Sequence, residues 1–124
     1  MKLNYCNVCH SSAIRKTSNK EVYGVEYGNG MCYLCDSCGS YVGCHKDGRP
    51  LGILANKQMR LKKIKCHSLF DAVWRSGELR RSECYHILSK KMNISYRDCH
   101  FGLFGIEELN AALNVLEKDN WHIN

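Results

Sequence analysis

Two pairs of cysteines constrain this chain of 124 residues more than any other feature of its sequence. Cys6 and Cys9 form one CxxC pair, Cys35 and Cys38 form a second, and 25 residues separate the pairs. A CxxC turn places two thiolates on one side of a tight loop, and two such loops joined by a hairpin form a tetrahedral four-sulfur site for zinc. The spacing therefore predicts a zinc ribbon in which these four cysteines hold one Zn²⁺ ion.

A zinc ion with four protein ligands has no open position for a substrate, so we expect this ion to stabilise the fold without catalysing a reaction. Two other interpretations compete. A redox CxxC pair usually stands alone at a helix N-terminus, which fits poorly with two pairs among predicted strands. Cys32 and Cys35 form a rival pair, but Cys38 followed by Gly39 makes the better turn. We therefore favour Cys35 and Cys38 as ligands.

The number and setting of the cysteines also point to metal rather than disulfides. The chain has nine cysteines, an odd number, and its first residues form no hydrophobic signal segment. We therefore expect a cytoplasmic protein whose thiols stay reduced. No apolar run approaches the ~18–20 residues of a membrane helix. A content of 44% hydrophobic and 24% charged residues is ordinary for a globular protein and argues against wholesale disorder.

Four cysteines are followed directly by histidine, at positions 9, 44, 66 and 99. Cys44, His45, Cys99 and His100 are a candidate second metal site or a Cys/His catalytic pair. Neighbouring side chains on a strand point apart, so one Cys-His dipeptide rarely supplies two ligands to the same metal. The competing interpretation is that these cysteines are small buried thiols and that the histidines are hydrogen-bonded. Cys66 and Cys84 fall on predicted helices, where we expect them to serve in packing.

The sequence pattern divides the chain into two halves, 1–52 and 53–124. The first half predicts short strands at residues 21–27, 31–35 and 40–42, with a glycine-containing turn at 28–30. The second half predicts helices at about 56–75, 82–92 and 106–118. The expected fold class is α+β, with a zinc ribbon packed on a three-helix bundle as one unit. The apolar positions expected in the first helix are Met59, Leu61, Ile64, Leu69, Phe70, Val73 and Trp74.

Positive charge is concentrated in the middle of the chain. The net charge is +6, and residues 56–97 hold 11 basic and 3 acidic side chains, whereas residues 98–124 hold 1 basic and 5 acidic ones. Such a block suggests contact with a polyanion, most commonly nucleic acid, although a solvated helix surface also explains it. The candidate nucleic-acid-binding residues are Lys57, Arg60, Lys62, Lys63, Lys65, Arg80 and Arg81.

Several segments together resemble a known family. They are residues 5–9, 21–24, 35–46, 49–52, 70–75 and 98–104, and the Tyr41–Val42–Gly43–Cys44–His45 stretch is far more specific than a bare CxxC pair. The chain is similar over about residues 4–118 to small zinc-finger-containing proteins of phages and bacterial genomes. The resemblance implies that Cys6, Cys9, Cys35 and Cys38 bind metal, and it suggests a phage or mobile-element setting. It implies no reaction, because the family has none assigned.

Three functions remain open on the sequence. The leading hypothesis is a non-enzymatic, zinc-stabilised protein that binds nucleic acid, with DNA as the expected partner. The second is an adaptor or inhibitor that binds a host protein, with Trp121 in the acidic tail as a contact. The third is a metal-dependent nuclease that uses His45 and His100. The sequence indicates no small-molecule substrate and no membrane partner.

Overall fold

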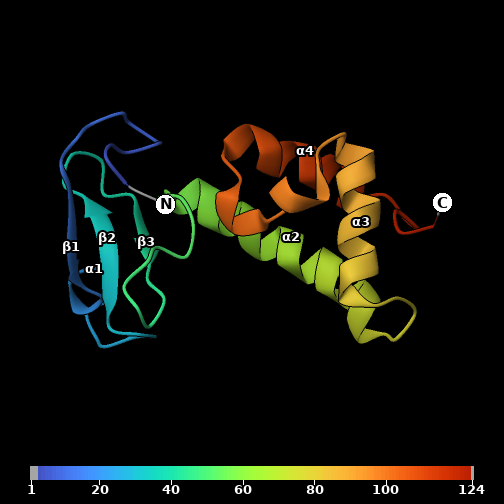
Figure 1. Ribbon diagram of the computed structural model, residues 1–124, viewed down its shortest axis with the longest axis horizontal. Helices are drawn as coiled ribbons and strands as arrows, with labels where there is room; N and C mark the ends of the chain where they lie inside the picture. The colour runs from blue at the N-terminus through green and yellow to red at the C-terminus, as the bar shows by residue number, and fades with distance from the viewer. Residues whose placement is uncertain (1–2, 124) are drawn as a thin grey trace. The chain divides into compact units, whose positions relative to one another are not determined.

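A computed structural model gives the structure of the protein and describes residues 3–123 (Figure 1). The chain divides into two compact units, which we call the ribbon unit, Met1–Gln58, and the helical unit, Met59–Asn124. The sheet lies in the first unit and three longer helices follow it, which confirms the α+β class. The domain bounds expected from the sequence, 1–52 and 53–124, stay a prediction, because compactness alone does not show which segment folds independently.

The ribbon unit is built on an antiparallel sheet of three short strands (Figure 1). They are β1 (Ile14–Ser18), β2 (Met31–Cys35) and β3 (Tyr41–Gly43), in the spatial order β1-β2-β3. Ile14 pairs with Cys35, so the first residue of β1 lies opposite the last residue of β2. This register brings the loop before β1 next to the loop after β2, and each loop carries one CxxC pair.

The strand predicted at residues 21–27 is wrong. That segment begins with a single helical turn, α1 (Lys20–Tyr23), which Gly24 ends with a left-handed backbone, φ 78°. The amide Nδ2 of buried Asn19 donates to the carbonyl of Tyr27 at 2.5 Å, which folds the segment back on itself. The alternating Val and Tyr residues suggested a strand, but the local turn chemistry of Asn19 and Gly24 prevails. Gly28 and Gly30 adopt positive φ before β2, as predicted.

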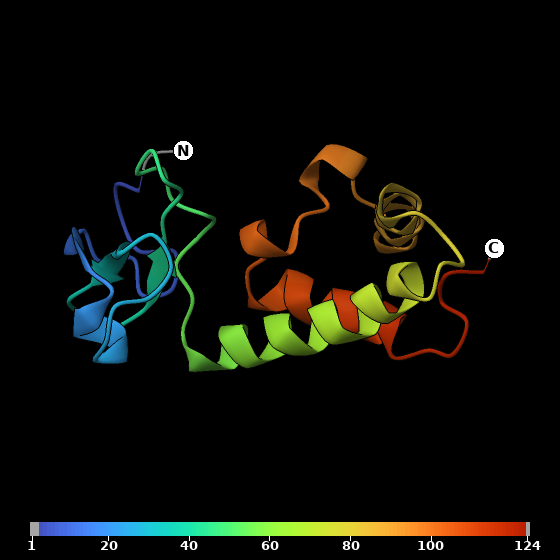
Figure 2. The same cartoon turned by 90° about the horizontal axis from the view of Figure 1, so that it is seen from below.

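The described part of the helical unit contains three helices and two short 3₁₀ turns. These elements are α2 (Lys57–Arg75), whose first two residues belong to the ribbon unit, α3 (Arg81–Met92), η1 (Tyr96–Asp98), η2 (Phe101–Leu103) and α4 (Ile106–Leu116). The three predicted helices are therefore confirmed to within about two residues at their ends, and the 3₁₀ turns were not predicted. In Figure 2, α4 runs beside α2, and α3 is seen end-on.

An aromatic cluster forms the core of the helical unit. The ring of fully buried Phe70 lies 4.4 Å from the Tyr85 ring, 5.4 Å from Phe101 and 5.8 Å from Trp121, measured between centroids. Trp121 is 5% exposed, so it belongs to this core rather than to an exposed tail. Cys66 and Cys84 are also buried in the unit, as expected for packing residues.

Two of the apolar positions expected in α2 lie on its exposed side. Leu61 is 57% exposed and Ile64 is 66% exposed. The buried residues of the helix are Met59, Cys66, Phe70 and Val73, which lie on the opposite side of a helix with 3.6 residues per turn. The apolar residues of α2 therefore occupy two opposite faces, and only one of them meets the core. Among the described residues, no helix combines the length and apolar character that a bilayer crossing requires.

Candidate metal centre

The two CxxC pairs converge on one point of the ribbon unit. The Sγ atoms of Cys6 and Cys38 lie 3.7 Å apart, and those of Cys9 and Cys35 lie 3.6 Å apart. All four ligand atoms lie within 4.8 Å of one another. A tetrahedral Zn²⁺ ion with Zn–S bonds of ~2.3 Å holds its sulfurs ~3.8 Å apart. The separations of 3.7 and 3.6 Å match this geometry, and the four-cysteine cluster supports one structural zinc ion.

The two cysteine loops have the same backbone design. In the first loop, His10 N–H donates to the carbonyl of Cys6 at 2.8 Å, and Cys6 N–H donates to the carbonyl of Ser11 at 2.7 Å. In the second loop, Gly39 N–H donates to Cys35 at 2.8 Å, and Cys35 N–H donates to Ser40 at 2.9 Å. His10 and Gly39 both have a left-handed backbone, with φ of 67° and 81°. The loops are therefore two copies of one turn, Cys-x-x-Cys followed by a left-handed residue and a serine.

Three of the four thiols, those of Cys6, Cys9 and Cys38, have pKa values that their surroundings and one another shift. Burial raises the pKa of Cys6, and backbone hydrogen bonds offset this only in part. A backbone hydrogen bond at Ser11 lowers the pKa of Cys9, but lost hydration and the neighbouring thiols outweigh it and raise that pKa to about 12. The Ser40 hydroxyl, whose Oγ lies 3.1 Å from the sulfur, lowers the pKa of Cys38 to about 6. Without a metal, these surroundings therefore favour the protonated thiol at Cys6 and Cys9 and the thiolate at Cys38. A bound divalent cation favours the thiolate at all four cysteines.

A small apolar cluster covers the buried side of the cysteine site. Cys6, Cys35 and Leu54 are each 0% exposed and pack together, with four partly buried residues against them: Leu3, Val8, Ile14 and Val42. Asn7, inside the first CxxC pair, fixes the position of Leu54 through two hydrogen bonds. Its Nδ2 donates to the Leu54 carbonyl at 2.8 Å, and its Oδ1 accepts from the Leu54 N–H at 2.9 Å. The segment before α2 is thereby attached directly to the cysteine site.

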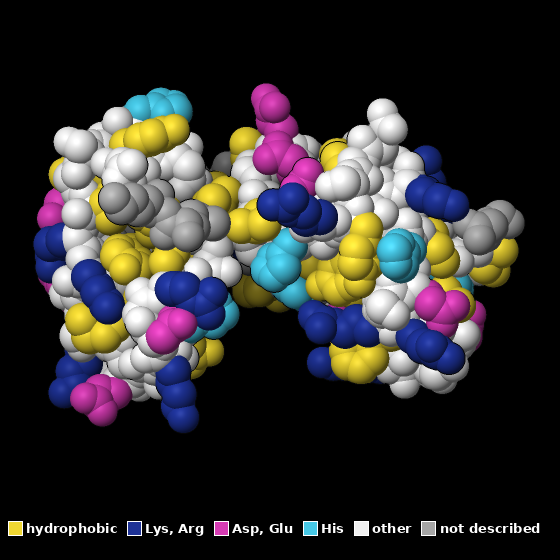
Figure 3. Space-filling model, viewed as in Figure 1, with side chains coloured by type: hydrophobic (Ala, Val, Ile, Leu, Met, Phe, Trp, Pro, Cys, Tyr) yellow, Lys and Arg dark blue, Asp and Glu magenta, His cyan; other side chains and the backbone are white. Residues whose placement is uncertain are grey.

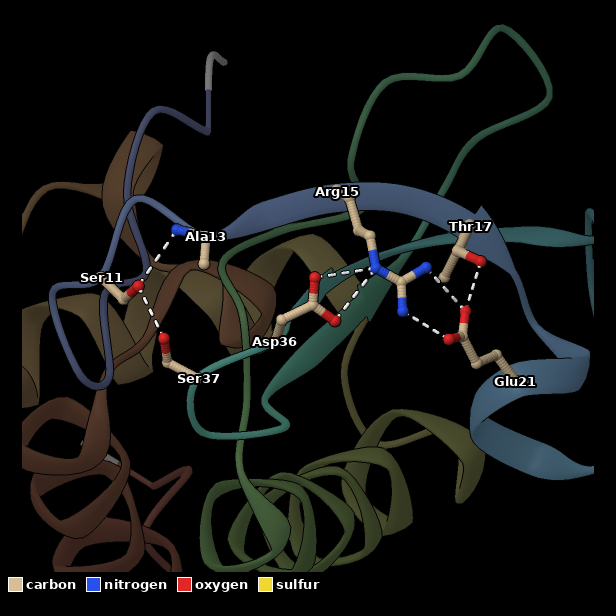
Figure 4. A network of polar contacts seen from close by, with 7 residues as sticks. All are labelled: Ser11, Ala13, Arg15, Thr17, Glu21, Asp36 and Ser37. Carbon is tan, nitrogen blue, oxygen red and sulfur yellow. Dashed lines mark hydrogen bonds and ion pairs between the residues drawn. The ribbon is translucent and has the colours of Figure 1, made fainter.

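A network of polar side chains ties the two cysteine loops to the sheet (Figure 4). Arg15 of β1 donates through Nε to both carboxylate oxygens of Asp36, at 3.0 and 2.8 Å, and its other nitrogens donate to Glu21 of α1. Asp36 lies inside the second CxxC pair. Ser37 Oγ, also inside that pair, donates to Ser11 Oγ at 2.8 Å, which joins the second loop to the first.

These supporting residues were not identified from the sequence. Asn7, Asp36 and Ser37 lie between the paired cysteines, and Ser40 follows them, so their position beside the predicted ligands was the available signal. Ion pairs such as that of Arg15 join residues far apart in the chain, and the pairing register of β1 with β2 was needed to place them. The site therefore depends on hydrogen bonds and ion pairs around the cysteines, and the spacing of cysteines in a sequence does not reveal these contacts.

The structure places the other predicted Cys-His pairs in different units. Cys44 and His45 follow β3 in the ribbon unit, whereas Cys99 and His100 lie between the 3₁₀ turns of the helical unit. In each pair the thiol is buried and the imidazole is exposed. Burial raises the pKa of Cys44, and it raises that of Cys99 to about 11. Over residues 3–123, the cluster of four cysteines is the metal-ligand group that the geometry reveals, and a second site stays a prediction.

The predicted nucleic-acid-binding residues of α2 lie on different sides of the helix. Lys62 Nζ donates to Asn110 Oδ1 of α4 at 2.6 Å, and Lys65 Nζ lies 3.4 Å from Glu117 Oε2, just beyond the end of α4. Both lysines therefore point toward α4. Lys57 lies in the exposed first turn of α2, and Arg80 precedes α3.

Other basic residues gather on one side of the helical unit. Arg60, Lys63 and His67 follow one another along α2 at spacings that share a face. Burial lowers the pKa of Lys63, and Arg60 lowers it further. Burial also lowers the pKa of His67; Asp71 opposes this, while Arg81, His100 and Lys63 add to it. The His67 ring lies 4.8 Å from the ring of Phe101, the residue after His100, measured between centroids. His100 lines one pocket together with Arg81 and Arg97, so these cations lie close together. We call this group, with the adjacent Arg97, the basic surface: Arg60, Lys63, His67, Arg81, Arg97 and His100.

Comparison with known proteins agrees with this geometry. A family model described as a zinc-finger-containing domain matches residues 2–119, a span that includes the four clustered cysteines. No curated protein and no solved structure matches the chain.

Proposed function

The chain belongs to this family of zinc-finger-containing domains, whose function is unknown, and from that premise we propose that it is a zinc-stabilised, non-enzymatic protein that binds DNA. The observation that supports DNA binding most directly is the basic surface of the helical unit. It joins cations of α2, α3 and the segment around η1 that are distant in sequence. In the view of Figure 3, Lys, Arg and His side chains of the helical unit gather around hydrophobic ones.

The chemistry of the basic surface suits a phosphate backbone. Arg81 and Arg97 form no ion pair with a carboxylate within residues 3–123, so their charge is available to a partner. The guanidinium of Arg81 lies 6.0 Å from the Trp74 ring centroid and 5.4 Å from that of Tyr85, which orients it. Contacts of this kind give salt-dependent binding with weak sequence preference. The remaining candidates from the sequence lie outside the basic surface and have an accessory part in binding: Lys57, Lys62, Lys65 and Arg80.

The proposed function has no catalytic step. A four-cysteine zinc site is closed to substrate, and the Cys99 thiol, whose pKa burial raises to about 11, is protonated at neutral pH and is a poor nucleophile. The finer parts of the proposal, a cytoplasmic location and an accessory role in a phage or mobile element, rest on the sequence resemblance and on the thiol content. They predict that the protein is made where host nucleic acid is accessible.

Fluorescence anisotropy with a labelled DNA duplex at ~50 and ~200 mM salt tests DNA binding. We expect the affinity to fall steeply between the two concentrations because bound phosphates release counterions. The double variant Arg60→Gln/Lys63→Gln should weaken binding and reduce the salt slope by about 1 for each lost cation. The matched control, Lys62→Gln/Lys65→Gln, removes the same charge from the α4 side of the same helix and should have a smaller effect.

Two results would overturn the proposal. One is the absence of DNA binding at ~50 mM salt by zinc-loaded protein. The other is binding that both double variants weaken equally, because it would show a response to net charge without a defined surface. The first result would leave the adaptor hypothesis, in which a host protein is the partner, as the explanation to pursue.

A further inference from the structure

A pocket in the helical unit opens onto one end of the basic surface. Its volume is about 280 Å³, close to the lower end of the ~300–1,000 Å³ typical of ligand pockets. Its walls come from the start of α3, from η1 and from the residues just after η1. The lining residues are Arg81, Tyr85, Tyr96, Arg97, Cys99 and His100, and we call it the arginine pocket.

The polar groups of this pocket are hydrogen-bond donors that approach from separate elements. Arg81 comes from α3, Arg97 from η1, and His100 from the segment after η1. Gly102 N–H donates to Nδ1 of His100 at 3.1 Å, so Nδ1 is the acceptor and the proton of the neutral imidazole is on Nε2. Burial raises the pKa of Tyr85, which keeps its hydroxyl protonated as a further donor. The pocket therefore offers donors to an acceptor-rich ligand.

Among the residues that the structure describes, no carboxylate lines the pocket to compete for these donors. Asp71, which acts on both His67 and Tyr85, accepts a hydrogen bond from Trp74 Nε1 at 2.8 Å and lies 3.7 Å from Arg75. Asp98 belongs to η1 but is not a lining residue. Two guanidinium groups without a carboxylate partner in one cavity are the arrangement that oxyanions prefer.

Aromatic rings form the rest of the wall. Tyr96 stacks on His86, with centroids 3.8 Å apart and an angle of 13° between the planes. This stacking orients the Tyr96 ring, which lines the pocket and is 46% exposed. Flat aromatic surfaces beside phosphate donors are how proteins hold a nucleobase together with its phosphate. The lining therefore fits a nucleotide better than inorganic phosphate alone.

We propose that the arginine pocket binds the phosphate monoester of a nucleotide. A monoester has three terminal oxygens, which can accept from Arg81, Arg97 and His100 at once. An internal phosphodiester has two such oxygens, and its chain must leave on both sides. The source of the monoester is either a free nucleotide or the phosphorylated end of a DNA strand. The second source rests on the proposed DNA binding and makes the pocket the part that recognises strand ends.

Isothermal titration calorimetry of the zinc-loaded full chain tests this site with four probes: deoxyadenosine 5′-monophosphate, deoxyadenosine, and one short DNA strand with and without a 5′-phosphate. We expect the monophosphate to bind and the nucleoside not to bind. If the strand end is the source, the phosphorylated strand binds more tightly than the unphosphorylated one. If a free nucleotide is the source, the two strands bind equally and the monophosphate still binds.

Arg97→Gln is the informative variant, because Arg97 is exposed and its side chain forms no ion pair within residues 3–123. It should weaken monophosphate binding about 10-fold or more, the usual value of a charged hydrogen bond. Lys90→Gln on α3 removes the same charge outside the pocket and should leave binding unchanged. Arg81→Gln provides a second variant of the pocket.

The site proposal fails if the monophosphate does not bind, or if Arg97→Gln and Lys90→Gln bind it equally well. Either result can be told apart from a failure of the proposed DNA binding. If only the pocket proposal fails, unphosphorylated duplex still binds to the protein, and the Arg60→Gln/Lys63→Gln variant still weakens that binding.

Discussion

At the level of single residues, we expect two positions beside the cysteines, Ser40 and Gly39, to affect how well the ribbon unit holds zinc. Ser40 is buried, and its hydroxyl favours the thiolate of Cys38. Gly39 provides the left-handed backbone that turns the chain after the second cysteine pair. His10 takes the equivalent place in the first loop at a conformational cost that glycine avoids. Both effects act on the geometry and charge of the thiolates without contact to the metal.

Replacing Ser40 with alanine should weaken zinc binding in a pH-dependent way. The pKa of Cys38 lies at about 6, below the ordinary value of 9.0, so the thiolate persists at neutral pH. Without the hydroxyl the pKa rises, and protons compete with zinc in the window between these two values. We expect about 10-fold weaker affinity at pH 7, with the difference fading above pH 9. Competition with a chromophoric chelator across this pH range measures it.

Ser37→Ala is the control, because Ser37 Oγ donates to Ser11 and not to a cysteine. Equal zinc affinity of the Ser40→Ala variant and the unchanged protein at pH 7 would contradict this account of Cys38.

Gly39→Ala should destabilise the zinc-bound ribbon by about 1–2 kcal/mol, the cost of a left-handed backbone for a residue with a Cβ atom. The space around the added methyl group is open, with no heavy atom within 4 Å, so the backbone alone sets the cost. His10→Gly should leave stability unchanged or increase it. Urea denaturation of the two zinc-loaded variants, followed by circular dichroism, tests whether they shift in these opposite directions. Equal destabilisation by both changes would show that the two loops are not equivalent turns.

At the level of elements, the two ends of α2 were predicted well, but the sequence did not show which side of the helix is buried. Asn56 before it and Gly77 after it are strong boundary signals, and the helix runs between them. Apolar residues at 59, 61, 64, 66 and 70 fit more than one face of a helix, so the sequence did not show that Leu61 and Ile64 are exposed. The basic residues are similarly dispersed, and the positions of α3 and α4 were needed to group them.

In the ribbon unit, the sequence predicted the metal ligands but not the first strand of the sheet. The CxxC spacing predicted the metal ligands because their chemistry demands local turns. Residues 14–18, with a single apolar residue followed by polar ones, gave no strand signal, yet they form β1 because β2 offers them a partner. Pairing with a neighbour decides strand formation in so short a sheet, and a single sequence does not contain that pairing.

The two faces of α2 can be distinguished by truncation. Phe70→Ala should lower the free energy of unfolding of the helical unit by about 3–5 kcal/mol, because it leaves a cavity among Tyr85, Phe101 and Trp121. Ile64→Ala, on the exposed face of the same helix, should change it by less than about 0.5 kcal/mol. Urea denaturation followed by tryptophan fluorescence reports on this unit, since both tryptophans lie in it. A comparable loss in the two variants would contradict the assignment of faces.

At the level of the whole molecule, the two units are stabilised in different ways. The helical unit has an aromatic core of its own, whereas the apolar cluster of the ribbon unit surrounds the cysteines and is small. A fold of this size usually needs a metal or a disulfide to compensate for a limited core. All nine cysteines are free in the structure, so within the ribbon unit the metal fulfils this role. Removing zinc should therefore unfold the ribbon unit.

The zinc content of the purified protein, measured by elemental analysis, tests the central claim most directly. The account predicts about one zinc per chain in the unchanged protein and in Cys32→Ala, whose cysteine lies in β2 outside the cluster, and much less in Cys38→Ala. A metal-free protein that keeps its strand signal in a strong chelator, or equal zinc content in Cys38→Ala and Cys32→Ala, would contradict it.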